Sequence, residues 1–273
     1  MTTTPTTFRQ RLDRIVTERG ALCVGIDPHP PLLAQWRLTD DADGLERFAR
    51  GLVAAIGERV AVFKPQVAFF ESYGSIGLAV LERVLADIRD AGALAIADAK
   101  RGDIGSTMAG YARAWLSDES PLHADAMTLS PFLGFESLRP ALDLAAATGR
   151  GVYVLARTSN PEGHGVQLST GSDGRPVSQR IIDEAQAENE RTGLDHVGLV
   201  IGARHADLGC EPGAVTGSIL APGIGAQGGT MEGVRAAFGP AVARVLPSVS
   251  RDVLSAGPDA AALGERVDRL LGS

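Results

Sequence analysis

The sequence predicts a single α/β domain folded as a (β/α)8 TIM barrel over residues 1–273. Three observations predict it. Apolar runs of strand length recur along the chain, a glycine-, proline- or polar-rich corner follows each run, and a helical pattern then leads to the next run. Runs that are apolar throughout suit strands buried on both faces, and strand–helix alternation favours parallel pairing through right-handed crossovers.

Eight runs carry the strand signal, at 21–27, 60–66, 94–100, 126–131, 151–159, 196–202, 218–225 and 244–249. Helical patterns are expected at 8–19, before the first strand, and then at 45–58, 76–90, 107–116, 135–147, 179–191, 231–237 and 260–271. The crossover after the sixth strand offers only a short candidate helix, 203–208. Eight units in 273 residues match the size of a barrel, and an open doubly wound sheet, which usually has fewer strands, is the alternative.

One segment breaks the alternation of strands and helices. Residues 160–176, NPEGHGVQLSTGSDGRP, are rich in Gly, Ser and Pro and have no hydrophobic period. A loop insert of this length in a compact domain is usually a lid or a mobile segment, and a disordered surface loop is the plainer interpretation. Its position directly after the fifth strand favours contact with a site at that end of the barrel.

Composition and charge argue against several classes of protein. Hydrophobic residues make up 44% of the chain and charged residues 22%, as in ordinary soluble globular proteins. The net charge of -7 disfavours general binding to nucleic acid or to an anionic membrane. No apolar stretch is long enough for a membrane span, and the N-terminus lacks the apolar core of a secretory signal. Cys23 and Cys210 form no C-x-x-C pair, so a reducing cytoplasm is the expected location.

Charged residues gather where the predicted strands end, which is where barrels of this kind carry their active sites. The third strand ends in IADAKRGD, which places Asp98 and Lys100 on one face because side chains alternate along a strand, with Asp103 just beyond. Lys64 lies near the end of the second strand and Asp27 ends the first. Burying several charges is costly unless they are paired, so the cluster predicts a functional site.

Each of these residues also has a plainer interpretation. Asp98 and Lys100 could form a simple salt bridge, and Asp103 could be a helix N-cap. Lys64 could extend along the rim to water, and Asp27 could merely open a turn. Their occurrence on successive strand ends favours one charge network. Lys100 beside carboxylates is expected to be a charged ammonium, and so an acid rather than a Schiff-base amine.

The loops after the seventh and eighth strands suggest an anion site. The seventh strand runs into PGIGAQGG, residues 222–229, where glycines expose backbone N–H groups, and Arg251 follows the eighth strand. These loops often bind phosphate in (β/α)8 enzymes, although a flexible corner and a surface arginine are the alternatives. Gln227 can both donate to and accept from a planar amide-like ligand. No His, Cys or carboxylate set has the spacing of a metal site, so no metal is expected.

These motifs resemble orotidine 5'-phosphate decarboxylase, and the chain looks like its longer bacterial subgroup, type 2, over roughly residues 21–251. The run Asp98-x-Lys100-x-x-Asp103 resembles the family signature, and Lys64 matches the family's first catalytic lysine. Other matches fall on the family's substrate contacts: Asp27 for the ribose, Ser159 for the pyrimidine, Gly225 and Gln227 in the phosphate loop, with Gln227 binding the pyrimidine, and Arg251 for the phosphate.

The resemblance implies decarboxylation of orotidine 5'-phosphate to uridine 5'-phosphate and CO2, a step of UMP biosynthesis that uses no metal or organic cofactor. Lys100 would stabilise the carbanion and deliver the proton, while Asp98 and Lys64 would hold Lys100 and the ribose hydroxyls. Asp103 would lie near the departing carboxylate. The resemblance also implies a homodimer in which Asp103 and Thr107 reach into the partner's site.

Two other functions remain open. A metal-dependent keto-sugar-phosphate decarboxylase or aldolase on the same barrel would carry an acidic metal ligand where Lys64 stands, and Lys64 and the Gln227 loop argue against it. A non-catalytic nucleotide-binding protein would bind uridine 5'-phosphate without turnover, and the intact charge set argues against that.

Overall fold

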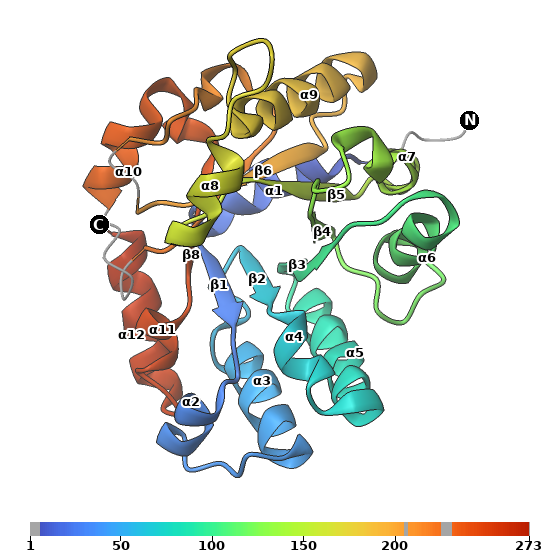
Figure 1. The fold of residues 1–273 in the computed structure, drawn as a ribbon. Helices are drawn as coiled ribbons and strands as arrows, with labels where there is room; N and C mark the ends of the chain where they lie inside the picture. Colours follow the sequence, from blue (N-terminus) through green and yellow to red (C-terminus); the bar gives the residue numbers. More distant parts are fainter. Residues whose placement is uncertain (1–5, 205–206, 225–230, 273) are drawn as a thin grey trace.

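The computed structural model describes residues 6–204, 207–224 and 231–272. Over these residues eight parallel strands form a closed barrel in sequence order, with β8 pairing back onto β1 (Figure 1). The strands are β1 Cys23–Ile26, β2 Val62–Pro65, β3 Leu94–Arg101, β4 Ala126–Leu129, β5 Gly151–Arg157, β6 Val197–Ile201, β7 Ile219–Pro222 and β8 Val245–Val249. The predicted (β/α)8 barrel is therefore confirmed.

Helices surround the strands, as Figure 1 shows. The longer ones are α1 Phe8–Arg19, α3 Ala42–Ile56, α5 Gly74–Asp90, α6 Gly105–Leu116, α7 Arg139–Thr148, α9 Val177–Thr192, α10 Met231–Phe238 and α12 Ala260–Leu271. They coincide with the predicted helical patterns. Shorter helices, which hydrophobic periodicity does not detect, turn the chain near strand ends: α2 Pro30–Gln35, α4 Val67–Glu71, α8 His164–Gln167, α11 Arg251–Leu254, and the 3-10 helices η1 Phe135–Leu138, η2 Pro161–Gly163, η3 Pro212–Ala214 and η4 Gly239–Arg244.

The candidate helix at 203–208 was wrong. The described residues of this range, 203–204 and 207–208, are not helical, and the crossover from β6 to β7 contains only η3 in its described part. Gly209, with a φ of +66°, and Pro212 prevent a helix from extending beyond this range, and six residues alone are too few to form a stable helix without packing. A left-handed glycine ends a helix, and proline removes a backbone donor.

The segment 160–176, expected as a loop insert, contains short regular elements. It begins with η2 and α8, and an isolated antiparallel bridge then joins Thr170 to Pro176. Gly171 N–H donates to the Arg175 carbonyl at 3.2 Å, closing a small turn between the bridged residues.

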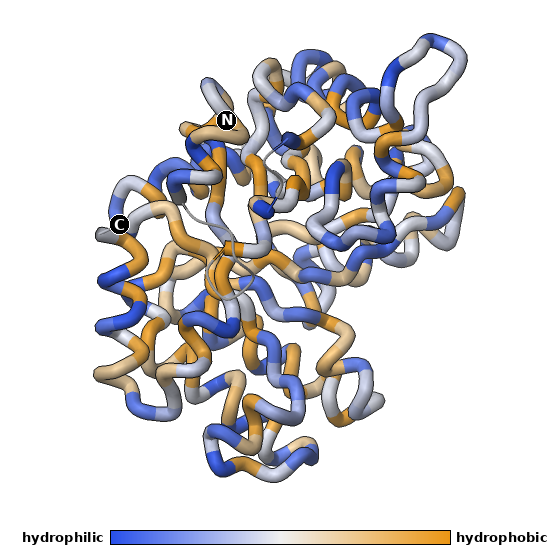
Figure 2. The backbone as a smooth tube through the Cα atoms, turned by 60° about the vertical axis from the view of Figure 1, so that its left-hand side comes forward, coloured by the Kyte–Doolittle hydropathy of each residue, from blue (hydrophilic) through white to orange (hydrophobic). Residues whose placement is uncertain are grey.

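Two apolar layers build the barrel. The outer layer lies between the strands and the surrounding helices, and Val24, Phe63 and Ala97 belong to it. The inner layer fills the barrel itself, and α1 closes its N-terminal end, where the ring of Phe8 meets that of Tyr153 edge-on with centroids 6.0 Å apart. Along the outer helices hydrophobic and hydrophilic residues alternate, as Figure 2 shows and as helices with one face on a barrel require.

The strand period determines which residues reach the mouth of the barrel. On β3 the inward row contains Leu94 and Ile96 in the inner layer and continues to Asp98, and on β2 Val62 leads to Lys64. On these two strands the deeper positions are apolar and close-packed, whereas the last inward position is charged. No helix within the described residues is long and apolar enough to cross a bilayer.

Candidate active site

A cavity of about 390 Å³ opens at the C-terminal ends of the strands, within the range of small-molecule sites. Every strand or the loop that follows it contributes to the cavity wall. Six of the predicted site residues line it: Asp27, Lys64, Asp98, Lys100, Ser159 and Arg251. The prediction that charged residues from successive strands converge on one rim therefore agrees with the structure.

Asp98 is the centre of the charge network. One carboxylate oxygen, Oδ2, accepts a hydrogen bond from Lys64 Nζ at 2.9 Å. The other, Oδ1, accepts from Lys100 Nζ at 2.7 Å and from Thr128 Oγ1 at 2.9 Å. Thr128 in turn accepts from the Lys100 backbone N–H at 2.8 Å. The two ammonium groups thus bind opposite oxygens of one carboxylate, and Thr128 closes a ring that fixes Lys100 relative to Asp98.

Burial and charge act in opposite directions on this network. The side chains of Lys64 and Asp98 are each 8% exposed. Burial alone would raise the pKa of Asp98, but the charges of Lys64 and Lys100 outweigh it and hold that pKa below its usual range. Burial likewise opposes charge on Lys64, yet Asp98 and Asp27 raise its pKa above the ordinary lysine value. The cavity therefore holds ionised groups that neutralise one another.

The two lysines differ in what they offer a ligand. Lys64 is enclosed, so its interpretation as a lysine extending along the rim to water was wrong, whereas the side chain of Lys100 is 45% exposed and reaches the open part of the cavity. Lys100 has a φ of +46°, a left-handed conformation that lysine rarely adopts, and the register of β3 against β4 shifts between Ala97 and Arg101. Strained backbone of this kind clusters at functional sites.

Gly102 permits the close turn that follows Lys100. A Cβ at this position would clash with the backbone carbonyl oxygen of Ser130 at the end of β4. The Ser130 N–H donates to the Arg101 carbonyl at 2.8 Å, so the two chain segments are held together there. Only glycine lets β3 end against β4 in this way, which supports the sharp turn expected from the sequence.

Two buried polar atoms in the cavity wall point to a ligand. Asp27 Oδ1 and Ser250 Oγ are buried and have no hydrogen-bond partner among the described residues. Gly25 lies between them, and a Cβ there would be 2.9 Å from Ser250 Cβ and 3.2 Å from the Asp27 carboxylate. Buried polar groups are normally paired, so these atoms are suited to a bound hydroxyl or water. Asp27 also opens a turn, since its carbonyl accepts from the His29 N–H at 2.8 Å.

Arg251 and Ser159 lie on the cavity wall as expected. Arg251 is the exposed first residue of α11, and within the described residues no hydrogen bond or ion pair occupies its guanidinium. Ser159 packs against the end of β6, where a Cβ on Gly202 would approach its N and Cβ to 2.8 Å. Gly225 and Gln227, the predicted phosphate-loop residues, lie outside the described residues.

Asp103 and Thr107 do not line the cavity of their own chain. Asp103 is half-buried, and its Oδ1 accepts from the Ile104 N–H at 2.8 Å. The helix-cap interpretation of Asp103 was wrong, because Ile104 occupies the N-cap position of α6 and no side chain caps that helix. Thr107 is exposed on the first turn of α6. Neither residue therefore contributes to the cavity wall of the chain that carries it.

The structure adds residues that had no predicted role. Thr128 is the most important, and its inward position at the end of β4 was a usable signal. His29 and Phe69 line the cavity mouth with ring centroids 6.1 Å apart, and they come from short helical turns that carry no periodic signal. Among the described residues no group of three or more His, Cys, Asp or Glu side chains could hold a metal ion.

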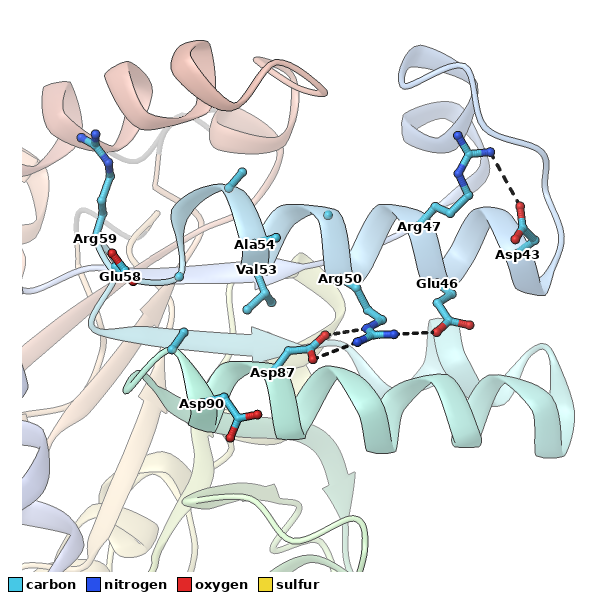
Figure 3. A pocket seen from close by; sticks show the side chains of 14 residues that line it. Asp43, Glu46, Arg47, Arg50, Val53, Ala54, Glu58, Arg59, Asp87 and Asp90 are labelled. Atoms are coloured by element: carbon cyan, nitrogen blue, oxygen red, sulfur yellow. Dashed lines mark hydrogen bonds and ion pairs between the residues drawn. The ribbon is translucent and has the colours of Figure 1, made fainter.

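A second hollow, of about 760 Å³, lies on the outside of the barrel between α3 and α5 (Figure 3). Its charged side chains bind one another: Arg50 Nε donates to Asp87 at 2.6 Å and Arg50 Nη1 to Glu46 at 3.1 Å. Glu46 also accepts from Arg83 at 2.7 Å. These pairs join the two helices and leave their charges compensated, so the chemistry belongs to the cavity at the strand ends.

Comparison with known proteins agrees with this site. Residues 20–265 match the family model described as orotidine 5'-phosphate decarboxylase / HUMPS family. The chain belongs to this family. The resemblance drawn from the sequence motifs is therefore confirmed, and the match extends to α12.

Relatives in the decarboxylase family align over nearly their whole length. Orotidine 5'-phosphate decarboxylase of Salinispora arenicola is 56% identical over 265 residues, which cover 97% of this chain and 95% of the relative. That of Streptomyces coelicolor is 53% identical over 263 residues, covering 96% and 95%. A crystal structure described as this decarboxylase from Streptomyces avermitilis superimposes with a TM-score of 0.95 at 52% identity, covering 99% of this chain and 95% of that one.

Proposed function

We propose that this protein removes CO2 from orotidine 5'-phosphate to give uridine 5'-phosphate, in the de novo biosynthesis of pyrimidine nucleotides. The observation that carries the proposal is the Lys64–Asp98–Lys100 network at the mouth of the barrel, with Lys100 directed to the open cavity. Relatives that share more than half of their residues with this chain carry the name of this decarboxylase. The pathway favours a cytoplasmic location.

The chemical difficulty of the reaction explains why the site needs fixed charge. When the bond from C6 to the carboxylate breaks, the electron pair stays at C6 in the ring plane, where the π-system cannot delocalise it. Stabilisation must come from charge already in place, because reorganising water or side chains during the step would cost energy. Enzymes lower such barriers by up to about 23 kcal/mol in ordinary cases.

Lys100 supplies that charge in our proposal. Its ammonium is held by Asp98 Oδ1 and its backbone by Thr128, so it stays in place as negative charge develops. As CO2 leaves, an Nζ–H proton moves from Lys100 to C6, and the electron pair of the broken C–C bond forms the new C–H bond. Asp98 stays ionised because Lys64 remains bound to its other oxygen.

The rest of the cavity suits the remaining parts of the nucleotide. We assign Asp27 and Ser250, with their unpaired buried oxygens, to the ribose hydroxyls. Arg251 at the start of α11 is assigned to the phosphate, Ser159 to the pyrimidine, and Gly225 and Gln227 to the loop that completes the site. Binding energy from the distant phosphate then contributes to the reaction at C6.

The active form is proposed to be a homodimer. Ile104 and Phe132, which are 62% and 79% exposed, and Leu133, at 53%, present large apolar side chains close in sequence to Asp103 or to the end of β4. Exposed apolar groups of this size mark interaction surfaces. Asp103 and Thr107 do not line the cavity of their own chain, which fits a role in the partner's site, where Asp103 would lie near the departing carboxylate.

A chelator experiment separates the proposal from a metal-dependent keto-sugar-phosphate enzyme on the same barrel. The decrease in absorbance of orotidine 5'-phosphate is followed with the protein before and after dialysis against EDTA. We expect equal rates, since the proposed mechanism uses no metal or organic cofactor. Loss of the activity in EDTA and its return with a divalent cation would contradict the proposal. Tight binding of uridine 5'-phosphate without any turnover would identify a non-catalytic nucleotide-binding protein.

A further inference from the structure

We propose that Gln167 of α8 is a positioning residue for the rim segment 158–160, and that through this segment it determines how well the site binds the pyrimidine ring. The inference rests on the proposed function, in which Ser159 contacts the pyrimidine. Gln167 does not line the cavity and touches no reacting group. Its effect passes through the rim segment, where Thr158, Ser159 and Asn160 all line the cavity.

Gln167 uses both ends of its amide group on the start of this segment. Its Oε1 accepts from the Thr158 backbone N–H at 3.0 Å, and its Nε2 donates to Thr158 Oγ1 at 2.7 Å. Oε1 also accepts from Arg157 Nη1 at 3.2 Å. One side chain nine residues away in sequence thus binds the backbone and the hydroxyl of Thr158 together. Both the position and the rotamer of that residue are fixed as a result.

The Thr158 hydroxyl also orients the next polar side chain of the rim segment, Asn160. Because the hydroxyl accepts a hydrogen bond from Gln167 Nε2, its own O–H donates to Asn160 Oδ1, at 2.6 Å. Asn160 Nδ2 then donates to Glu162 at 2.9 Å. Each group in this series donates to the next one along the chain. Removing the Gln167 amide would therefore leave the Thr158 hydroxyl free to rotate, and Asn160 would no longer be held in one orientation.

The rim segment packs closely against two glycines, Gly202 and Gly163. On the barrel side a Cβ at Gly202 would approach the N and Cβ of Ser159 to 2.8 Å, and the Gly202 N–H donates to the Arg157 carbonyl at 2.7 Å. On the α8 side a Cβ at Gly163 would meet Gln167 Nε2 and Thr158 Oγ1, each at 2.9 Å. Ser159 therefore packs against the end of β6, while Thr158, the residue before it, is held by the Gln167 amide.

Arg157 is a buried residue that holds Gln167 and the rim segment together. The residue is 4% exposed, and its described hydrogen bonds go to neutral oxygens: the Leu208 carbonyl, the Thr158 carbonyl and Gln167 Oε1, each at 3.2 Å. A buried charge is costly unless its donors are satisfied, so these acceptors are constrained in turn. The Arg157 guanidinium thus forms hydrogen bonds with the rim segment, with α8 and with the β6–β7 crossover.

The test compares Gln167→Met, which keeps the side-chain volume without its hydrogen bonds, with Val166→Ala as a matched control. Val166 lies on the same short helix and is 51% exposed. The affinities for uridine 5'-phosphate and for ribose 5-phosphate, which lacks the base, are measured together with kcat and KM on orotidine 5'-phosphate. Gln167→Glu serves as the conservative variant, because its carboxylate still accepts from Thr158 N–H and Arg157.

For Gln167→Met we expect uridine 5'-phosphate affinity and kcat/KM to fall about 10- to 100-fold, the scale of a misplaced substrate-positioning group, while ribose 5-phosphate affinity stays at the control value. Gln167→Glu should recover only the part of the loss that comes from the Thr158 N–H and Arg157 bonds, since its carboxylate cannot donate to the Thr158 hydroxyl. Equal losses for both ligands, or no loss relative to Val166→Ala, would overturn the inference. Failure of the wild type to decarboxylate orotidine 5'-phosphate would instead refute the proposed function, so the two failures are distinguishable.

Discussion

The hydroxyl of Thr128 should be essential to the charge network, although it belongs to an uncharged residue. It accepts from the Lys100 backbone N–H at 2.8 Å and donates to Asp98 Oδ1 at 2.9 Å, and the residue is 1% exposed. Thr128→Val keeps the shape of the side chain and removes both bonds. Thr128→Ser keeps the hydroxyl and loses only a methyl group, so it is the matched control.

The magnitude follows from the two lost bonds. A hydrogen bond to a charged group contributes about 1.5–3 kcal/mol, and a buried N–H left without a partner costs about 1–3 kcal/mol. A total near 3 kcal/mol lowers the melting temperature by about 5–6 °C for a chain of this size. If about 2 kcal/mol of the loss falls on the orientation of Lys100 in the transition state, kcat/KM decreases roughly 30-fold.

Melting by circular dichroism and steady-state decarboxylation of orotidine 5'-phosphate measure the two effects. We expect Thr128→Val to show both decreases and Thr128→Ser to stay close to the wild type in both. A Thr128→Val protein that melts early but keeps the wild-type kcat/KM would show that the hydroxyl supports the fold alone. That result would refute the argument that Thr128 fixes Lys100 for catalysis.

Three further predictions test other parts of the site. Arg251→Ala should raise KM about 10- to 100-fold with a smaller effect on kcat, because a charge-assisted contact to phosphate is lost; an unchanged KM in steady-state assays would remove Arg251 from the phosphate site. The pKa of Asp98 is depressed in the folded state, so its stabilisation is complete above the unfolded value near about 4 and is lost as pH falls below it. The melting temperature of Asp98→Asn should therefore fall less steeply than that of the wild type between about pH 5 and about pH 3, and parallel curves would contradict this account. Phe132→Glu should shift the protein towards monomers in sedimentation equilibrium and lower its activity, whereas an active monomer would contradict a shared site.

The strand period made much of the fold predictable from the sequence. Long apolar runs indicate strands that are buried on both faces. Because these runs alternate with helical patterns, only a few chain topologies are possible. The same period places Lys64 and Asp98 on inward rows that are apolar below and charged at the mouth. Strand geometry alone therefore made it predictable that Lys64 and Asp98 belong to one charge network.

Other features depend on tertiary contacts that leave no local pattern. The left-handed backbone of Lys100 is stabilised by Thr128 on a neighbouring strand, and nothing in the run ADAKRG requires it. The helical turn of α8 is short and polar, so periodicity could not reveal it, and Gln167 gains its partners only when the chain returns to β5. A side chain whose importance comes from a contact across the fold is hard to assign from sequence alone.

Comparing the rates of decarboxylation by the wild type and by Lys100→Ala tests whether the Lys100 ammonium carries the reaction. Lys100 is the ammonium that reaches the open cavity, and its removal leaves Asp98 bound to Lys64. We expect the absorbance of orotidine 5'-phosphate to decrease with the wild type. Lys100→Ala should lose at least about 1,000-fold in rate and still bind uridine 5'-phosphate. No decrease with the wild type, or equal rates for both proteins, would contradict the account.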